Sequence, residues 1–133
     1  MIDKKDYSIE IIDDIMFYTC KCKILSKEIV LEGIKDRISL SNNEDQYIVS
    51  DMLSVGYWPS SARDELGKKE HQILVKCAAV IIKSNLIATL LNWFLIFFGI
   101  EIPTKIFPDK KPALEWITVQ KLKDQKTELK ETS

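Results

Sequence analysis

Short runs of apolar residues, separated by polar turn residues, fill the first part of the chain. Residues 7–12 alternate in part between polar and apolar side chains, and Asp13-Asp14 is typical of a turn. Residues 15–20 are rich in β-branched and aromatic residues, which favour strands. Together these segments predict a β-hairpin.

The next residues predict one helix and one strand. Apolar side chains recur at helical spacing over about 27–40, directly after Ser26, a good N-cap residue. The polar stretch 41–45 is typical of a loop, and residues 47–53 are typical of a strand. The pattern up to this point is therefore strand, strand, helix, strand.

A second alternation of helix and strand occupies the middle of the chain. Ser61 is a plausible N-cap for a helix over 62–70. Residues 73–82 are mostly apolar, which suits a central strand covered on both faces. A helix over 85–98 should follow and end near Gly99.

The C-terminal part adds a short strand at 104–107 and a helix that begins after Asp109. Residues 121–133 are highly charged and weakly amphipathic, as expected of a helix end or a mobile tail. The full order is ββαβαβαβα. It predicts an α/β sandwich in one domain over residues 1–120, with four helices on a mixed five-stranded sheet.

The predicted helix over 85–98 has an unusual composition. It contains no charged residue, and only Asn85, Thr89 and Asn92 form a polar stripe, whereas a surface helix normally has a wide charged face. The stretch is shorter than the roughly 20 residues that span a membrane. We expect its large apolar side chains to form a contact surface, and these are Leu86, Leu90, Trp93, Phe94, Phe97 and Phe98.

The sequence leaves four alternatives for what packs against this surface. They are other parts of the same chain, a second subunit in a homodimer, an apolar small molecule, and a membrane surface. Trp58, beside Tyr57 in a predicted loop, is a further contact residue, because tryptophan is enriched in interfaces. Packing of Trp58 over a helix end is the alternative interpretation.

Composition narrows the classes of function. The chain has 133 residues with 19 basic and 20 acidic side chains, which excludes a disordered chain and a polybasic nucleic-acid binder. The charged N-terminus lacks the apolar core of a signal peptide, so we expect a cytoplasmic protein, peripheral to the membrane if residues 85–98 bind lipid. The abundance of isoleucine and lysine indicates an AT-rich, bacterial source.

No motif carries catalytic or metal chemistry. Cys20, Cys22 and Cys77 have only His71 to complete a metal site, and nothing in the sequence forces these residues together. A single histidine excludes acid–base chemistry built on two histidines, and the four glycines are isolated, so the sequence has no Gly-rich phosphate loop. We therefore expect a non-enzymatic protein without cofactors.

Three stretches resemble the STAS domain of bacterial anti-anti-sigma factors, and most closely the SpoIIAA-like proteins. They are residues 48–51 followed by 60–66, residues 78–84 leading into the apolar helix, and residues 103–109 followed by Lys110-Lys111-Pro112-Ala113-Leu114-Glu115-Trp116-Ile117. The resemblance covers about residues 7–120 and implies a STAS/SpoIIAA-like fold.

The resemblance implies two kinds of function. STAS regulators bind an anti-sigma-type protein and are switched by phosphorylation of a serine that opens the helix after the third strand. Ser61, or its neighbour Ser60, matches that position, although the acidic residue before it and the glycine after it are absent. The SpoIIAA-like branch is also similar to CRAL-TRIO domains, which hold apolar ligands near membranes. Our main hypothesis is a binding module that uses Trp58 and residues 85–98, and the alternative is a regulator switched at Ser61.

Overall fold

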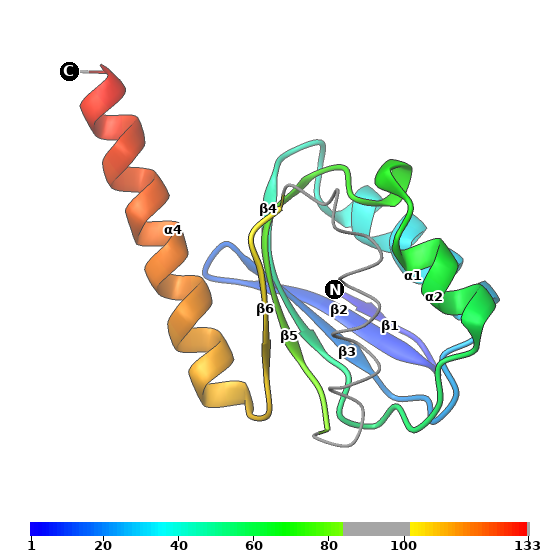
Figure 1. The fold of residues 1–133 in the computed structure, drawn as a ribbon. Coiled ribbons are helices and arrows are strands. Elements are labelled where there is room, and N and C mark those ends of the chain that lie inside the picture. Colours follow the sequence, from blue (N-terminus) through cyan, green and yellow to red (C-terminus); the bar gives the residue numbers. More distant parts are fainter. Residues whose placement is uncertain (84–101, 133) are drawn as a thin grey trace.

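A computed structural model describes residues 1–83 and 102–132 of the chain (Figure 1). The strands are β1 (Ile2–Asp3), β2 (Tyr7–Ile12), β3 (Ile15–Cys20), β4 (Gln46–Asp51), β5 (Val75–Ile81) and β6 (Thr104–Phe107). The helices are α1 (Lys27–Leu40), α2 (Ser60–Leu66), the 3₁₀ turn η1 (Lys69–His71) and α4 (Lys110–Thr132). From β3 to β5 the elements alternate between strand and helix, as the sequence predicts.

The six strands form one mixed sheet in which the order in space, β1-β2-β3-β4-β5-β6, equals the order in the sequence. β1, β2 and β3 pair antiparallel, and β3 to β6 pair parallel. The β2–β3 hairpin turns at Asp13 and Asp14, whose φ angles of 52° and 62° fit a type I′ turn. Parallel neighbours need a crossover: α1 lies in the one between β3 and β4, and α2 with η1 lies in the one between β4 and β5.

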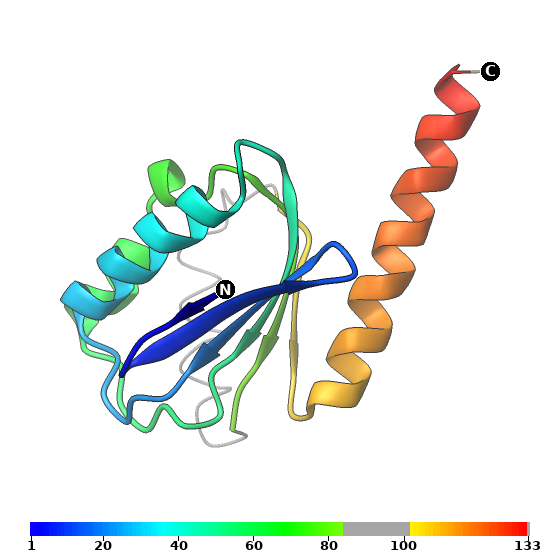
Figure 2. The same cartoon turned by 180° about the vertical axis from the view of Figure 1, so that it is seen from behind.

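Helices cover both faces of the sheet. α1 and α2 lie over one face and α4 lies against the other, as Figures 1 and 2 show from opposite sides. The alternation along β5 fits this arrangement, because Cys77, Ala79 and Ile81 are buried in the same core cluster as residues of α4. Ala78 and Val80 face the α1/α2 side. The predicted strand is thus β5, an interior strand of the sheet between β4 and β6.

α1 has the bounds and the cap that the sequence predicts. The Ser26 hydroxyl oxygen accepts a hydrogen bond from the Ile29 N–H at 3.3 Å. Gly33 is unfavourable within a helix, and packing explains its presence, since a β-carbon at this position would overlap the hydroxyl of Tyr18 on β3. Gly33 therefore allows α1 to approach the sheet closely.

The predicted bounds of α2 are wrong. α2 begins at Ser60, with Pro59 at the N-cap position and no side-chain cap, so Ser61 is not the cap residue. The Pro59 carbonyl accepts hydrogen bonds from the N–H groups of Ala62 and Arg63, and this starts the helix earlier than predicted. The helix also ends earlier, because the chain continues into the separate 3₁₀ turn η1.

The bounds of two strands differ from prediction for local reasons. β4 ends at Asp51, whose carboxylate accepts a hydrogen bond from the Leu53 N–H at 3.0 Å and turns the chain. β5 begins at Val75 because Leu74 has a positive φ of 61°, outside the strand region. Within the described residues the sheet has six strands instead of the predicted five, since β1 has only two residues and leaves no pattern in the sequence. The predicted helix over 85–98 lies outside the described residues.

α4 is longer than its contact with the sheet. Its first half packs on the sheet through Ala113 and Ile117, which are fully buried. The Tyr47 hydroxyl of β4 donates a hydrogen bond to Asp124 at 2.5 Å. Beyond this contact, the helix extends past the sheet to Thr132 (Figure 2), so residues 121–132 continue the helix. None of the described helices has the length and apolar character that crossing a membrane requires.

Candidate functional site

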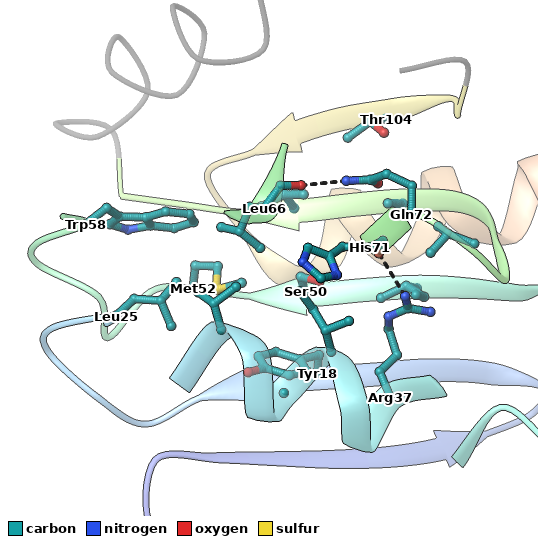
Figure 3. Close-up of a pocket in the computed structure, with 17 residues that line it drawn as sticks. Tyr18, Leu25, Arg37, Ser50, Met52, Trp58, Leu66, His71, Gln72 and Thr104 are labelled. Atoms are coloured by element: carbon teal, nitrogen blue, oxygen red, sulfur yellow. Dashed lines mark hydrogen bonds between the residues drawn. The ribbon is translucent and has the colours of Figure 1, made fainter. Parts of the chain in front are cut away.

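A pocket of about 160 Å³ lies between the sheet and the α1/α2 layer (Figure 3). Its floor includes Tyr18, Ser50, Ala78, Val80 and Thr104, which come from β3, β4, β5 and β6. Strand pairing sets Tyr18 opposite Ser50 and Ser50 opposite Val80, so these three residues form a row across the sheet. The small side chains of Ser50 and Ala78 leave space above the central strands, and the pocket occupies this space.

One end of the pocket is apolar and includes Leu25, Met52, Trp58 and Leu66. Trp58 is only 7% exposed and packs in the same core cluster as Leu25 and Met52. The sequence predicts Trp58 as a contact residue, with packing over a helix end as the alternative. In the structure its side chain is buried and lines the pocket. Its neighbour Tyr57 is 61% exposed instead.

The other end of the pocket is formed by Arg37 of α1 together with His71 and Gln72. Arg37 is 7% exposed, and its Nη2 donates a hydrogen bond to the backbone carbonyl of His71 at 3.0 Å. Its Nη1 is buried and has no hydrogen-bond partner among residues 1–83 and 102–132. The guanidinium also forms no ion pair with a carboxylate within these ranges. Burial lowers the pKa of Arg37.

A charged network beside the pocket fixes the position of His71. Glu65 of α2 is buried, and its carboxylate lies 2.7 Å from Lys68 Nζ and 2.9 Å from His71 Nε2. Hydrogen bonds to Lys68 and His71 keep the pKa of Glu65 below its usual value. The network joins α2 to η1 and so holds the backbone carbonyl that Arg37 contacts.

Two further polar side chains of the pocket bond to nearby backbone. Gln72 Nε2 donates to the Leu66 carbonyl at 2.6 Å, and Thr104 Oγ1 donates to the Ile102 carbonyl at 3.0 Å. Ser50 makes no side-chain hydrogen bond with another described residue. The pocket thus combines apolar walls with a few polar groups, an arrangement that suits a compact molecule with one polar end.

Comparison with known proteins shows the family. Residues 7–121 match a family described as a domain of unknown function, DUF7793. The chain belongs to the DUF7793 family. Among the curated proteins, none matches this DUF7793 chain.

The solved structure of another protein is similar in fold to the DUF7793 chain. It is an uncharacterized protein from the DUF3478 family with a SpoIIAA-like fold, from Shewanella loihica PV-4. The two chains align with a TM-score of 0.62 and 19% sequence identity, over 84% of the DUF7793 chain and 91% of the other. This likeness concerns the fold alone, and it confirms the SpoIIAA-like fold that the sequence resemblance implies.

The remaining predicted site residues are either exposed on α2 or outside the described residues. Ser60 and Ser61 are exposed in the first turn of α2 and are not part of its lining. The contact residues of the predicted apolar helix lie outside the described residues, and they are Leu86, Leu90, Trp93, Phe94, Phe97 and Phe98. In the part of the chain that the structure describes, no three His, Cys, Asp or Glu side chains form a group suited to a metal ion.

Arg37 is the residue that sequence reasoning missed. Val30, Gly33, Ile34 and Arg37 all line the pocket, and their spacing of i, i+3, i+4 and i+7 is that of one helix face. Arg37 therefore stands on the apolar stripe of α1. A charged residue on such a stripe is the signal that could have identified it.

Proposed function

We propose that this DUF7793 chain is a non-enzymatic, SpoIIAA-like binding module whose pocket holds a compact, mainly apolar molecule. The observation that carries the proposal is the pocket between the sheet and α1/α2, with Trp58 and Met52 at one end and Arg37 at the other. An apolar pocket with a few placed polar groups is the usual form of a small-molecule site.

The volume of the pocket limits the size of the molecule. An apolar cavity of about 150 Å³ can hold benzene, and the pocket of the DUF7793 chain measures about 160 Å³. A single ring or a short branched chain therefore fits. A diacyl lipid is far larger than this volume, so the pocket favours a small ligand over a membrane lipid.

Titration with benzamide, a neutral ring compound, tests this proposal. In two-dimensional NMR spectra, the amide signals of pocket residues should shift and reach saturation. Ala78→Leu fills the floor of the pocket and should abolish the shifts, whereas Glu10→Leu, at an exposed position on β2 outside the lining, should retain them. The proposal fails if the parent chain shows no saturable binding or if Ala78→Leu binds equally well.

The segment 85–98 supports a second contact of the same module, with a second subunit, an apolar ligand or a membrane surface. The supporting observation is that the segment contains no charged residue. Light scattering tests the homodimer, and sedimentation with lipid vesicles tests the membrane surface. A monomeric chain that stays in the supernatant with vesicles would exclude both.

An anti-anti-sigma-type regulator is the alternative function. Ser60 and Ser61 are exposed in the first turn of α2, and neither hydroxyl serves as an N-cap, so a kinase could reach them. Incubation with anti-sigma-type kinases should place phosphate on Ser61, as measured by peptide mass spectrometry. If Ser61→Ala accepts as much phosphate as the parent chain, this assignment is wrong.

A further inference from the structure

Arg37 is a charged residue that the fold buries without a counter-charge among the described residues. Its side chain is 7% exposed, and its hydrogen bond to the His71 carbonyl leaves Nη1 without a partner in residues 1–83 and 102–132. Burial of a guanidinium is unfavourable unless an opposite charge and hydrogen bonds compensate for the lost water. A buried polar group in this state needs a specific explanation, and an ion or ligand is one of the few available.

The buried carboxylate of α2 and a half-buried carboxylate of α1 pair with lysines. Glu65 of α2 lies 2.7 Å from Lys68 Nζ, and Asp36 of α1 lies 2.7 Å from Lys4 Nζ. Neither carboxylate forms an ion pair with Arg37. The positive charge of Arg37 is therefore available to a molecule in the pocket.

We propose that the ligand of this pocket is a compact organic carboxylate, whose carboxylate group accepts hydrogen bonds from Arg37 and whose apolar body lies toward Trp58. The inference rests on the proposed function, since it names the class of ligand for the same pocket. Figure 3 shows Arg37 and Trp58 at opposite ends of the pocket, with Ser50 between them.

The donor geometry favours a carboxylate. A guanidinium presents its N–H groups in a planar fork that matches the two oxygens of a carboxylate. Nη1 carries two N–H groups, and both are free to donate within the described residues. Ser50, which makes no side-chain hydrogen bond with another described residue, adds a hydroxyl donor on the floor of the pocket.

A comparison of benzoate with benzamide on the full chain tests the inference. The two compounds have the same ring and nearly the same shape, so they differ mainly in charge. We expect benzoate to bind at least about ten-fold more tightly than benzamide, because hydrogen bonds to a charged group are the stronger ones. Titrations followed by NMR give both dissociation constants.

Arginine variants locate the source of this preference. Arg37→Met keeps the length of the side chain without its charge, and it should abolish the preference for benzoate while retaining benzamide binding. Arg63→Met is the matched control, because Arg63 is the other arginine of the chain and does not line the pocket. It should keep the preference.

Each outcome separates the inference from the proposed function. If neither compound binds, both are wrong. If the parent chain binds both compounds equally, the proposed function stands and the carboxylate inference is overturned. Unchanged benzoate preference in Arg37→Met also overturns it.

Urea unfolding without ligand gives a readout of structure. Arg37→Met should be at least as stable as the parent chain, and a marked loss of stability would assign Arg37 a structural role instead.

Discussion

At the scale of single residues, Cys22 differs from the other two thiols. The neighbouring Cys20 side chain lowers the pKa of Cys22 to about 7, and the Cys22 side chain is partly exposed. The proximity of Cys22 together with burial raises the pKa of Cys20, and burial raises the pKa of Cys77 to about 11. Thiolates, not thiols, react with alkylating reagents, so Cys22 should be the reactive cysteine.

Iodoacetamide labelling tests this difference. At neutral pH the native chain should gain one label, on Cys22. The rate of labelling should rise with pH and level off above the pKa of about 7, where Cys22 is mostly thiolate. Peptide mass spectrometry identifies the labelled residue, and Cys22→Ser should remain unlabelled. Faster labelling of Cys77 would contradict the prediction.

The close packing of Gly33 against Tyr18 gives a second prediction at the residue scale. Gly33→Ala should destabilise the chain by about 1–3 kcal/mol through overlap with Tyr18, even though alanine is the better helix former by about 1 kcal/mol. Urea unfolding measures the change. Tyr18→Phe removes the overlapping hydroxyl, so the double variant should recover part of the loss. A Gly33→Ala chain as stable as the parent would show that the contact is not tight.

At the scale of elements, the hydrogen bond between Tyr47 and Asp124 attaches the middle of α4 to β4 at 2.5 Å. Tyr47→Phe should lower the free energy of unfolding by about 1.5–3 kcal/mol, because the acceptor is a carboxylate. Asp124→Asn should have a smaller effect, and the double variant should lose less than the sum of the two. Simple additivity in urea unfolding would exclude a direct interaction.

The sequence predicts those elements that local signals define. Asp13-Asp14 marks the hairpin turn, and Ser26 marks the start of α1, so the bounds of both elements are correct. The start of α2 is missed because a backbone carbonyl, that of Pro59, begins the helix where a side-chain cap was expected.

The pocket could not be predicted in the same way. Its floor depends on the row of Tyr18, Ser50 and Val80, which three strands distant in sequence bring together. The burial of Trp58 and Arg37 likewise depends on how α1 and α2 lie over the sheet. Local patterns carry no information about such contacts, although the position of Arg37 on an apolar stripe was visible in the sequence.

At the scale of the whole molecule, Glu65 links stability to pH. Its pKa is lowered in the folded chain by Lys68 and His71, whereas an unfolded glutamate titrates near about 4.3. The contribution of Glu65 to folding stability is therefore present above its unfolded pKa and is lost as the pH falls through its folded pKa.

Substitution of this residue should change the acid side of the stability profile. Glu65→Gln should flatten the decline of stability below about pH 5, measured by urea unfolding at a series of pH values. Glu44→Gln, at an exposed position in the loop after α1, should keep the slope of the parent chain. If stability falls with pH equally steeply in Glu65→Gln and in the parent chain, the Glu65 network does not contribute to the pH dependence of stability.

The sheet adds its strands in the order in which the chain is synthesised. No strand has to enter between two strands that are already paired, so each new strand can join the one completed just before it as the chain leaves the ribosome. β1, β2 and β3 pair first, and β4, β5 and β6 extend them in turn. Since Thr104 of β6 belongs to the floor of the pocket, the nascent chain acquires a complete pocket only when its last strand has joined the sheet.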